Sequence, residues 1–146
     1  MKLNSPAFKN NEAIPVQYTC DGQDINPPLE ISDMPEDTKS LVLIVDDPDA
    51  AAGDWVHWLV WNIKPQTKEI TENSVPSGAV EGTTSFGQPG YGGPCPPKGT
   101  HRYFFKLYAL DTDLNLDQNA DKQQLEIVIK DHIINQTELI GLYTRR

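Results

Sequence analysis

A chain of 146 residues is long enough to bury a hydrophobic core, and it is predicted to form one domain spanning residues 1–146. Its net charge of −9 and its pI of about 4.6 argue against nucleic acid and anionic membrane surfaces as partners. No apolar run approaches the ~20 residues of a transmembrane helix, and Met1–Pro6 lacks the apolar stretch of a secretory signal, so a cytoplasmic location is expected.

The N-terminal third is punctuated by residues that interrupt regular structure. Residues 4–19 are predicted to form one or two short strands, broken by Asn10-Asn11 and by Pro15. Cys20-Asp21-Gly22 is a turn signal, and Pro27-Pro28 marks a rigid segment.

Two continuous apolar runs follow, at Leu41–Val45 and Trp55–Ile63. Runs of this length and β-branched content are typical of strands that are buried on both faces. The first ends at Asp46-Asp47-Pro48-Asp49 and the second at Lys64-Pro65, whereas residues 66–88 are polar and are expected to hold only short strand pieces.

A rigid loop is predicted next, because nine of the thirteen residues of Gly87–Gly99 are Gly or Pro. Such a loop can bring backbone N–H groups close to a ligand. Residues 101–110 then alternate as a third core strand, with the odd-numbered side chains on one face. His101 and Tyr103 therefore share a face at the mouth of this strand.

The C-terminal part changes character. A helix is predicted from about Ala120 to Asp131, capped by Asp117 or Asn119, with a core face formed by Leu125, Val128 and Ile129. Residues 132–143 fit either a strand or an extension of the helix. Several strands in series with one late helix favour a mainly β fold, an antiparallel Greek-key β-sandwich with one C-terminal helix.

The ends of the three core strands carry the polar groups that could do chemistry. Asp47 and Asp49 follow the first strand, His57 lies in the second, and His101 and Tyr103 begin the third. A histidine within an apolar strand is costly unless its ring nitrogens are paired. For His57 alone, a core residue bonded to a carbonyl remains an alternative, but the set as a whole predicts a small polar pocket.

The order and spacing of these segments resemble the phosphatidylethanolamine-binding protein family, which includes the Raf kinase inhibitor proteins. The resemblance covers nearly the whole chain, and the N- and C-terminal segments are similar to its compact bacterial and archaeal branch. The matching segments are Tyr18-Thr19-Cys20-Asp21-Gly22, Asn26-Pro27-Pro28-Leu29, Asp47-Pro48-Asp49-Ala50, Trp55 with His57, Gly90–Gly99, His101-Arg102-Tyr103 and Leu139-Ile140-Gly141-Leu142-Tyr143.

The resemblance implies an anion pocket in a central antiparallel β-sandwich. Asp49 would brace the neighbouring loop or touch the edge of the ligand, and Ala51 stands where the family commonly has proline. The implied pocket lining is Asp47, His57, His101 and Tyr103, together with backbone N–H groups near Gly93 and Cys95.

The function that the resemblance implies is non-catalytic binding of a phosphate-type anion or a phosphoethanolamine head group, with no cofactor. Imidazole, phenol and amide groups are hydrogen-bond donors that suit phosphate, and Asp47 could accept from an ammonium group. Two histidines would make binding sensitive to pH near neutrality. A kinase or protease partner, or a second copy of the chain, remains open.

Two enzyme alternatives remain. Asp47, His57 and His101 could form a metal site of a hydrolase, although no HxH or HExxH spacing is present. Cys95 with His101 and Asp47 could form a thiol catalytic group. No GxSxG motif supports serine esterase chemistry.

The two cysteines, Cys20 and Cys95, both lie in loop segments of the family pattern. On that resemblance the two loops are expected to be neighbours, so the thiols could pair as a disulfide. The alternative is a pair of reduced thiols, because cytosolic proteins seldom keep disulfides.

Overall fold

The computed structural model describes residues 1–145. Its regular elements are a 3-10 helix at Val16–Tyr18, one α-helix, and nine strands. The elements are β1 (Lys2–Asn4), β2 (Glu12–Ala13), β3 (Leu29–Ser32), β4 (Ser40–Asp47), β5 (Trp55–Ile63), β6 (Glu69–Ile70), β7 (Val80–Glu81), β8 (Thr100–Leu110), α1 (Lys122–Ile129) and β9 (Ile133–Thr144).

The strands form two sheets, with the order β1-β3-β6 in the smaller and β2-β9-β8-β4-β5-β7 in the larger. Among the strands of residues 1–145, only the β2–β9 pair is parallel. Strands β4, β5 and β7 pair in sequence, and β8 returns over a long connection to lie beside β4, which is the Greek-key order. The predicted fold class and the adjacency of the three core strands are confirmed.

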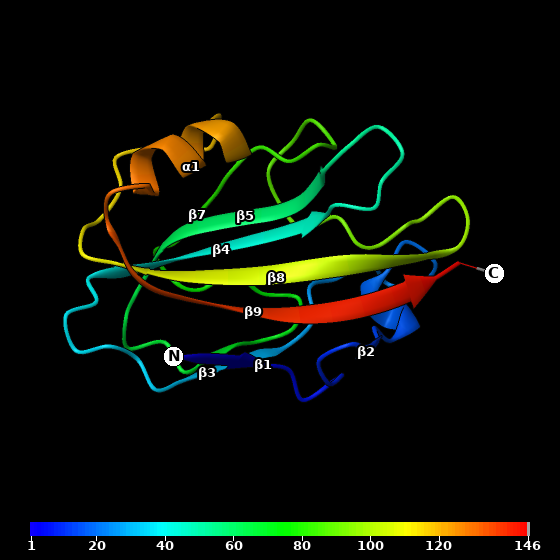
Figure 1. The fold of residues 1–146 in the computed structure, drawn as a ribbon, viewed down its shortest axis with the longest axis horizontal. Helices are drawn as coiled ribbons and strands as arrows, with labels where there is room; N and C mark the ends of the chain where they lie inside the picture. The colour runs from blue at the N-terminus through cyan, green and yellow to red at the C-terminus, as the bar shows by residue number, and fades with distance from the viewer. Residues whose placement is uncertain (146) are drawn as a thin grey trace.

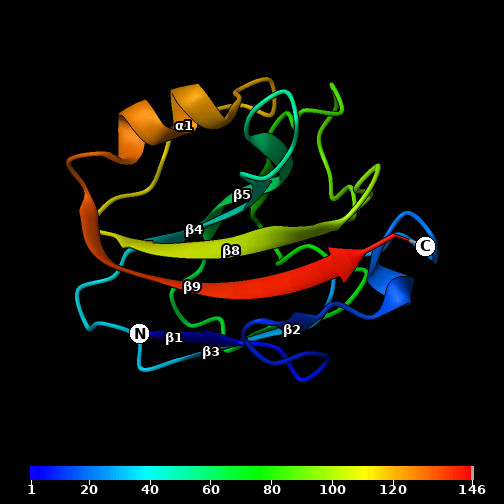
Figure 2. The ribbon, with the colours of Figure 1, turned by 45° about the vertical axis from the view of Figure 1, so that its right-hand side comes forward.

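The molecule is layered, with the smaller sheet on one side of the larger and α1 on the other (Figures 1 and 2). Strand β4 supplies side chains to both interfaces. Leu41, Leu43 and Val45 belong to the apolar cluster that includes β1 and β3, whereas Val42 and Ile44 pack in the cluster that includes α1. All five are at most 1% exposed, so the prediction that this strand is buried on both faces is confirmed.

The helix was predicted in the right place, but its cap and core face were partly wrong. Asp121 is the N-cap, because its side chain accepts from the backbone N–H of Gln124 while the Gln124 side chain accepts from the Asp121 N–H. Asp117 instead closes the preceding turn. Leu125 and Ile129 are buried, but Val128 is 36% exposed. Within residues 1–145, no helix is long and apolar enough to cross a membrane.

Pairing between strands that are distant in the sequence determines the structure of the segments for which the sequence predicted two alternatives or none. Residues 133–144 form β9, which pairs along its whole length with β8, so the strand alternative is correct. The short strand pieces expected within residues 66–88 are β6 and β7. The 3-10 helix and β3 were not predicted, since a three-residue turn and a four-residue strand after two prolines carry little periodicity.

Candidate functional site

A cavity of about 260 Å³ opens at one end of β4, β5 and β8. It lies where the polar ends of these three strands meet two connecting segments. Its lining is formed by Asp47, Ala50, Ala51, Ala52, Trp55, His57, Phe86, Cys95, Pro96, Pro97, His101 and Tyr103. The structure therefore brings together the four side chains, Asp47, His57, His101 and Tyr103, that the sequence predicted to converge.

Asp47 and His101 form the polar centre of the cavity. Alternation along β4 places Asp46 and Asp47 on opposite faces of the sheet, and Asp47 faces the cavity while being only 3% exposed. Its Oδ2 lies 2.6 Å from His101 Nδ1, and its Oδ1 accepts from the Asp49 N–H at 2.8 Å. Both carboxylate oxygens are thus bonded, and Nε2 of His101 is left for a ligand.

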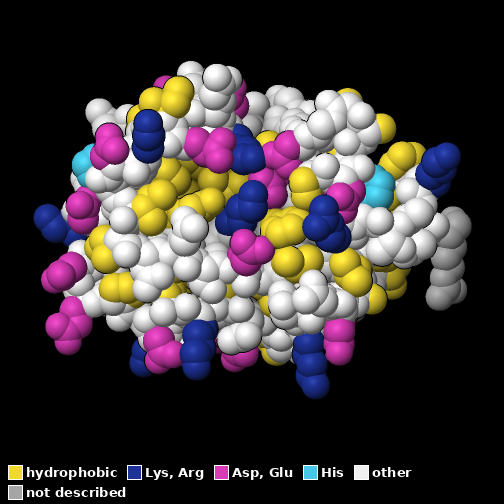
Figure 3. All heavy atoms as spheres, viewed as in Figure 1, with side chains coloured by type: hydrophobic (Ala, Val, Ile, Leu, Met, Phe, Trp, Pro, Cys, Tyr) yellow, Lys and Arg dark blue, Asp and Glu magenta, His cyan; other side chains and the backbone are white. Residues whose placement is uncertain are grey.

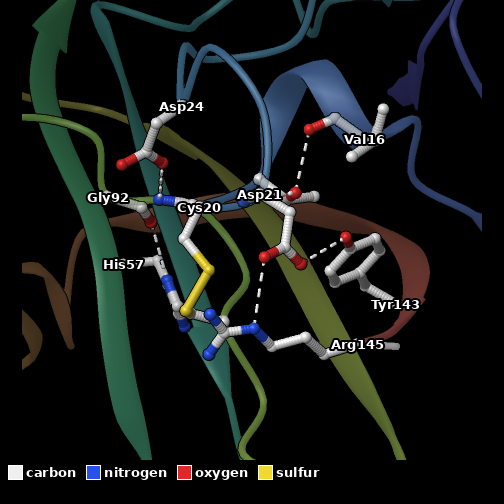
Figure 4. The surroundings of a disulfide bond; sticks show 11 residues. Val16, Cys20, Asp21, Asp24, His57, Gly92, Tyr143 and Arg145 are labelled. Carbon is white, nitrogen blue, oxygen red and sulfur yellow. Dashed lines mark hydrogen bonds and ion pairs between the residues drawn. A yellow bond between two sulfur atoms is a disulfide. The ribbon is translucent and has the colours of Figure 1, made fainter.

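His57 reaches the cavity because of a β-bulge. Val45 pairs with Trp58 and Asp46 pairs with Val56, so His57 is an additional residue opposite β4. A bulge redirects side chains out of the regular alternation. The His57 ring packs edge-on against Tyr103 at 5.2 Å, and its Nδ1 donates to the Gly92 carbonyl at 2.7 Å (Figure 4).

Burial lowers the pKa of His57 below its ordinary value, and the hydrogen bond to Gly92 and the charge of Asp47 only partly oppose this effect. The ring is therefore neutral at pH 7. With Nδ1 donating to Gly92, Nε2 of His57 is a hydrogen-bond acceptor toward the cavity.

We expect His57 to make folding less favourable as the pH falls. The unfolded chain takes up a proton near pH 6.5 and the folded protein only at lower pH, so the contribution of His57 is complete above 6.5 and is lost below it. Urea unfolding at about pH 7.5, 6.5 and 5.5 should show the stability difference between wild type and His57→Gln shrinking with acidity. A difference that stays constant would contradict the buried neutral ring.

Tyr103 provides a hydroxyl group that lacks a protein partner. The residue is 1% exposed, and within the described chain its hydroxyl makes no hydrogen bond of good geometry, although the Cys95 backbone N–H approaches its oxygen. Burial is the main cause that raises the pKa of Tyr103, the negative charge of Asp47 adds to it, and the Cys95 backbone amide opposes it. The phenol therefore stays protonated and remains a donor at any physiological pH.

Gly93 does not have its predicted role. Its N–H, expected to face the ligand, donates to Asp24 Oδ1 at 2.7 Å, and Gly93 is not part of the cavity lining. A Cβ at this position would lie 2.5 Å from both Asp24 Oδ1 and the Tyr18 carbonyl oxygen. Glycine is needed here for close packing of the loop against residues 18–24, which turns its N–H away from the cavity.

Asp49 braces the edge of the cavity and does not line it. Arg102 holds its carboxylate with two side-chain hydrogen bonds, at 2.8 and 2.9 Å, and with its backbone N–H at 3.0 Å. The hydrogen bonds from Arg102 are the main cause that lowers the pKa of Asp49 to about 2. Of the two predicted roles, the structure supports the one in which Asp49 fixes the loop.

Cys20 and Cys95 are joined in a disulfide with a Cα–Cα distance of 5.5 Å, and Cys95 forms part of the cavity wall. Figure 4 shows the bond lying close to His57, Gly92 and Asp21. The thiol nucleophile considered for Cys95 is therefore wrong, since the described residues include no free cysteine. No three His, Cys, Asp or Glu side chains in residues 1–145 are arranged to hold a metal ion.

Sequence reasoning missed one part of the aromatic wall. Phe86 is 45% exposed and packs edge-on against Trp55 and His57, each at 5.5 Å. It stands alone in a polar stretch without periodicity, so no pattern indicated it. In the structure Gly92 leaves room for this side chain, since a Cβ on Gly92 would collide with the Phe86 ring.

A larger hollow of about 800 Å³ lies elsewhere, between β2 and the end of β9. Its walls are mostly apolar, and its one carboxylate, Asp21, is already bonded to Tyr143 and Arg145 (Figure 4). The smaller cavity is lined by the buried, unpaired Tyr103 hydroxyl and by the Asp47–His101 pair, and it is the candidate site for this reason.

A two-sheet β-sandwich with a small polar cavity at the ends of its central strands defines a binding-protein fold. The profile of the phosphatidylethanolamine-binding protein family matches residues 4–144, and the chain belongs to that family. It is 50% identical to the UPF0098 protein of Pyrococcus horikoshii over 97% of this chain and 76% of that protein. It is 46% identical to the UPF0098 protein of Methanothermobacter thermautotrophicus over 99% of each.

Solved structures agree in fold. A phosphatidylethanolamine-binding protein homologue of Chlamydia trachomatis superposes with a TM-score of 0.95 at 42% identity, covering 99% of this chain and 97% of that one. YbcL of E. coli, described as a new member of the mammalian PEBP family, superposes with a TM-score of 0.93 at 32% identity, covering 99% and 98%. The predicted membership in the bacterial and archaeal branch is confirmed.

Proposed function

We propose that this protein is a non-catalytic binding protein whose cavity takes a phosphate-type anion or a phosphoethanolamine-like head group. The observation that carries the proposal is the buried Tyr103 hydroxyl, which lacks a hydrogen-bond partner among the described residues. A buried unpaired donor costs free energy, and a ligand that accepts its hydrogen bond removes that cost.

The neighbouring groups suit the same ligand. Protonated His101 would be ion-paired with Asp47 and would offer its Nε2–H to an anion. The Cys95 backbone N–H approaches the Tyr103 oxygen, so the part of Tyr103 that remains for a ligand is its O–H proton. Each Asp47 oxygen already accepts one hydrogen bond. A carboxylate oxygen can accept a second one, so Asp47 could also accept from the ammonium group of a phosphoethanolamine-like ligand.

The volume of the cavity limits the size of the ligand. At about 260 Å³ it lies below the range of roughly 300–1,000 Å³ that is usual for drug-sized molecules. A small polar ligand buries few atoms, so we expect dissociation constants in roughly the millimolar to high micromolar range.

Tyr103→Phe is the test of this proposal, because its two expected effects have opposite signs. Removing the unpaired hydroxyl should leave the free protein as stable as wild type or stabilise it by about 1 kcal/mol. The same change should weaken binding of phosphate and phosphoethanolamine about tenfold, since the ligand loses a buried donor. Urea unfolding and titration calorimetry measure the two effects.

The control is Tyr108→Phe, a half-buried tyrosine of the same strand whose side chain packs in the α1 cluster on the other face. We expect it to leave both affinities unchanged. Equal ligand binding by wild type and Tyr103→Phe would remove the hydroxyl from the site. Release of phosphate from phosphoethanolamine during the titration would contradict a non-catalytic role.

A further inference from the structure

The loop that joins β4 to β5 forms one side of the cavity mouth. We call residues 48–54 the rim loop; its members Ala50, Ala51 and Ala52 line the cavity. Gly53 has a φ of +106°, and no proline lies between residues 49 and 54 to restrict the backbone. The rim loop therefore depends on contacts with the rest of the protein for its position.

These contacts are few. Within the described chain, the backbone of the rim loop makes one internal hydrogen bond, from the Gly53 N–H to the Ala50 carbonyl. The Asp49 N–H also donates to Asp47 of β4 at 2.8 Å. The remaining hold on the loop comes from two of its own carboxylates. Asp49, at its beginning, is bonded to Arg102 of β8, and Asp54, at its end, is paired with Lys122 at 2.5 Å.

Lys122 is the first residue of α1, on the side of the sheet opposite the smaller sheet. Its ammonium group also pairs with Asp46 at 2.8 Å, and the Asp46 side chain is only 1% exposed. Lys106 of β8 pairs with the same carboxylate oxygen of Asp46 at 3.0 Å. Figure 3 shows acidic and basic side chains close together on this face, below α1.

The two lysines thus differ in one respect. Both neutralise buried Asp46, but only Lys122 also reaches Asp54 of the rim loop. Asp46 is the neighbour of the cavity residue Asp47 at the end of β4. The Lys122 ammonium, at the start of α1, therefore contacts both the end of β4 and the rim loop. Because buried Asp46 already holds the Lys122 side chain in place, pairing with Asp54 costs less side-chain entropy than it would for a free surface lysine. The Lys122–Asp54 pair therefore stabilises the rim loop more than an ordinary surface ion pair would.

We propose that Lys122 is a positioning residue that fixes the rim loop through Asp54 and thereby sets the affinity of the cavity for its anionic ligand. The inference rests on the proposed function for its ligand, but the order of the loop is a property of the free protein. If the binding-competent position of the loop is populated only in part, the apparent dissociation constant rises by the inverse of that fraction.

Asp54→Ala tests this inference, with Lys106→Met as the matched control. Asp54→Ala removes the contact with the loop and leaves Lys122 paired with Asp46. We expect it to weaken phosphate and phosphoethanolamine binding about three- to tenfold. Amide hydrogen exchange at Gly53, whose N–H makes the internal hydrogen bond of the loop, should rise by a similar factor. Lys106→Met should lower the melting temperature, because Asp46 loses a cation, while affinity and loop exchange stay at the wild-type values.

Lys122→Met should combine the two results, with a lower melting temperature, weaker binding and faster loop exchange. Wild-type affinity and wild-type loop exchange in Asp54→Ala would overturn the inference, as would an equal loss of affinity in Lys106→Met. If wild type binds neither ligand, the proposed function fails by itself. Loop exchange in the same three variants then decides the positioning role, because it requires no ligand.

Discussion

His101→Ala is expected to weaken binding of phosphate and phosphoethanolamine by about ten- to a hundredfold, the range of one charge-assisted hydrogen bond. The substitution removes the Nε2 atom that is left for a ligand and also leaves Asp47 without its partner at 2.6 Å. The uncompensated carboxylate would then repel the anion. Titration calorimetry of wild type and variant at one pH gives the ratio of affinities directly.

His132→Ala is the matched control for this change. His132 forms the same kind of pair, with its Nδ1 at 2.8 Å from Asp111 Oδ1, but both residues are exposed and neither lines the cavity. We expect His132→Ala to bind as wild type does. Equal affinities in wild type and His101→Ala would exclude His101 from the site, and thermal unfolding of all three proteins would separate lost binding from lost folding.

The core of the fold was predictable because it rests on local patterns. Continuous apolar runs identified β4 and β5, and alternation identified β8 together with its cavity-facing side chains. The α1 cap was missed because Asp117, Asn119 and Asp121 are all acceptable N-cap residues within five positions. Only the side chain of Gln124, which completes a capping box with Asp121, distinguishes among them.

The sequence predicted which side chains converge on the cavity, but it did not predict the direction of the backbone N–H groups in the neighbouring loop. His101 and Tyr103 were placed correctly because strand alternation fixes the faces of β8. Asp47 was expected in a turn and was assigned to the pocket by the family resemblance, whereas it is the last residue of β4. His57 reaches the cavity through a bulge, which no alternation pattern contains. Gly93 was assigned a donor role wrongly, because the direction of a loop N–H depends on a partner, Asp24, that is distant in sequence.

The contacts of the rim loop could not be predicted from the sequence either. Lys122 lies 68 residues from Asp54 and 76 from Asp46, as their numbers show, and charged residues at such separations meet only when the tertiary structure brings them together. In the sequence, Lys122 belongs to an ordinary polar face of a helix. Its role becomes visible only because α1 packs with its first turn over the end of β4.

Loss of the Cys20–Cys95 disulfide is expected to lower the free energy of unfolding by about 4–5 kcal/mol in the chain-entropy model, given the sequence separation of 75 residues. For a chain of this size that corresponds to a fall in melting temperature of about 10–20 °C. The double variant Cys20→Ala/Cys95→Ala, compared with wild type with and without dithiothreitol, measures it. The variant should not respond to dithiothreitol, and two reactive thiols in unfolded, non-reduced wild type would contradict the bond.

The effect on the cavity should be smaller than the effect on stability. Three hydrogen bonds hold the Gly87–Gly99 loop to residues 18–24 independently of the sulfur atoms. The Tyr91 hydroxyl donates to the Tyr18 carbonyl at 2.7 Å, the Gly93 N–H donates to Asp24 at 2.7 Å, and the Cys20 N–H donates to the Pro94 carbonyl at 3.1 Å. We therefore expect the double variant, at a temperature where it is folded, to bind phosphoethanolamine less than about tenfold more weakly than wild type. A complete loss of binding by the folded variant would mean that the disulfide, and not these hydrogen bonds, shapes the wall of the cavity.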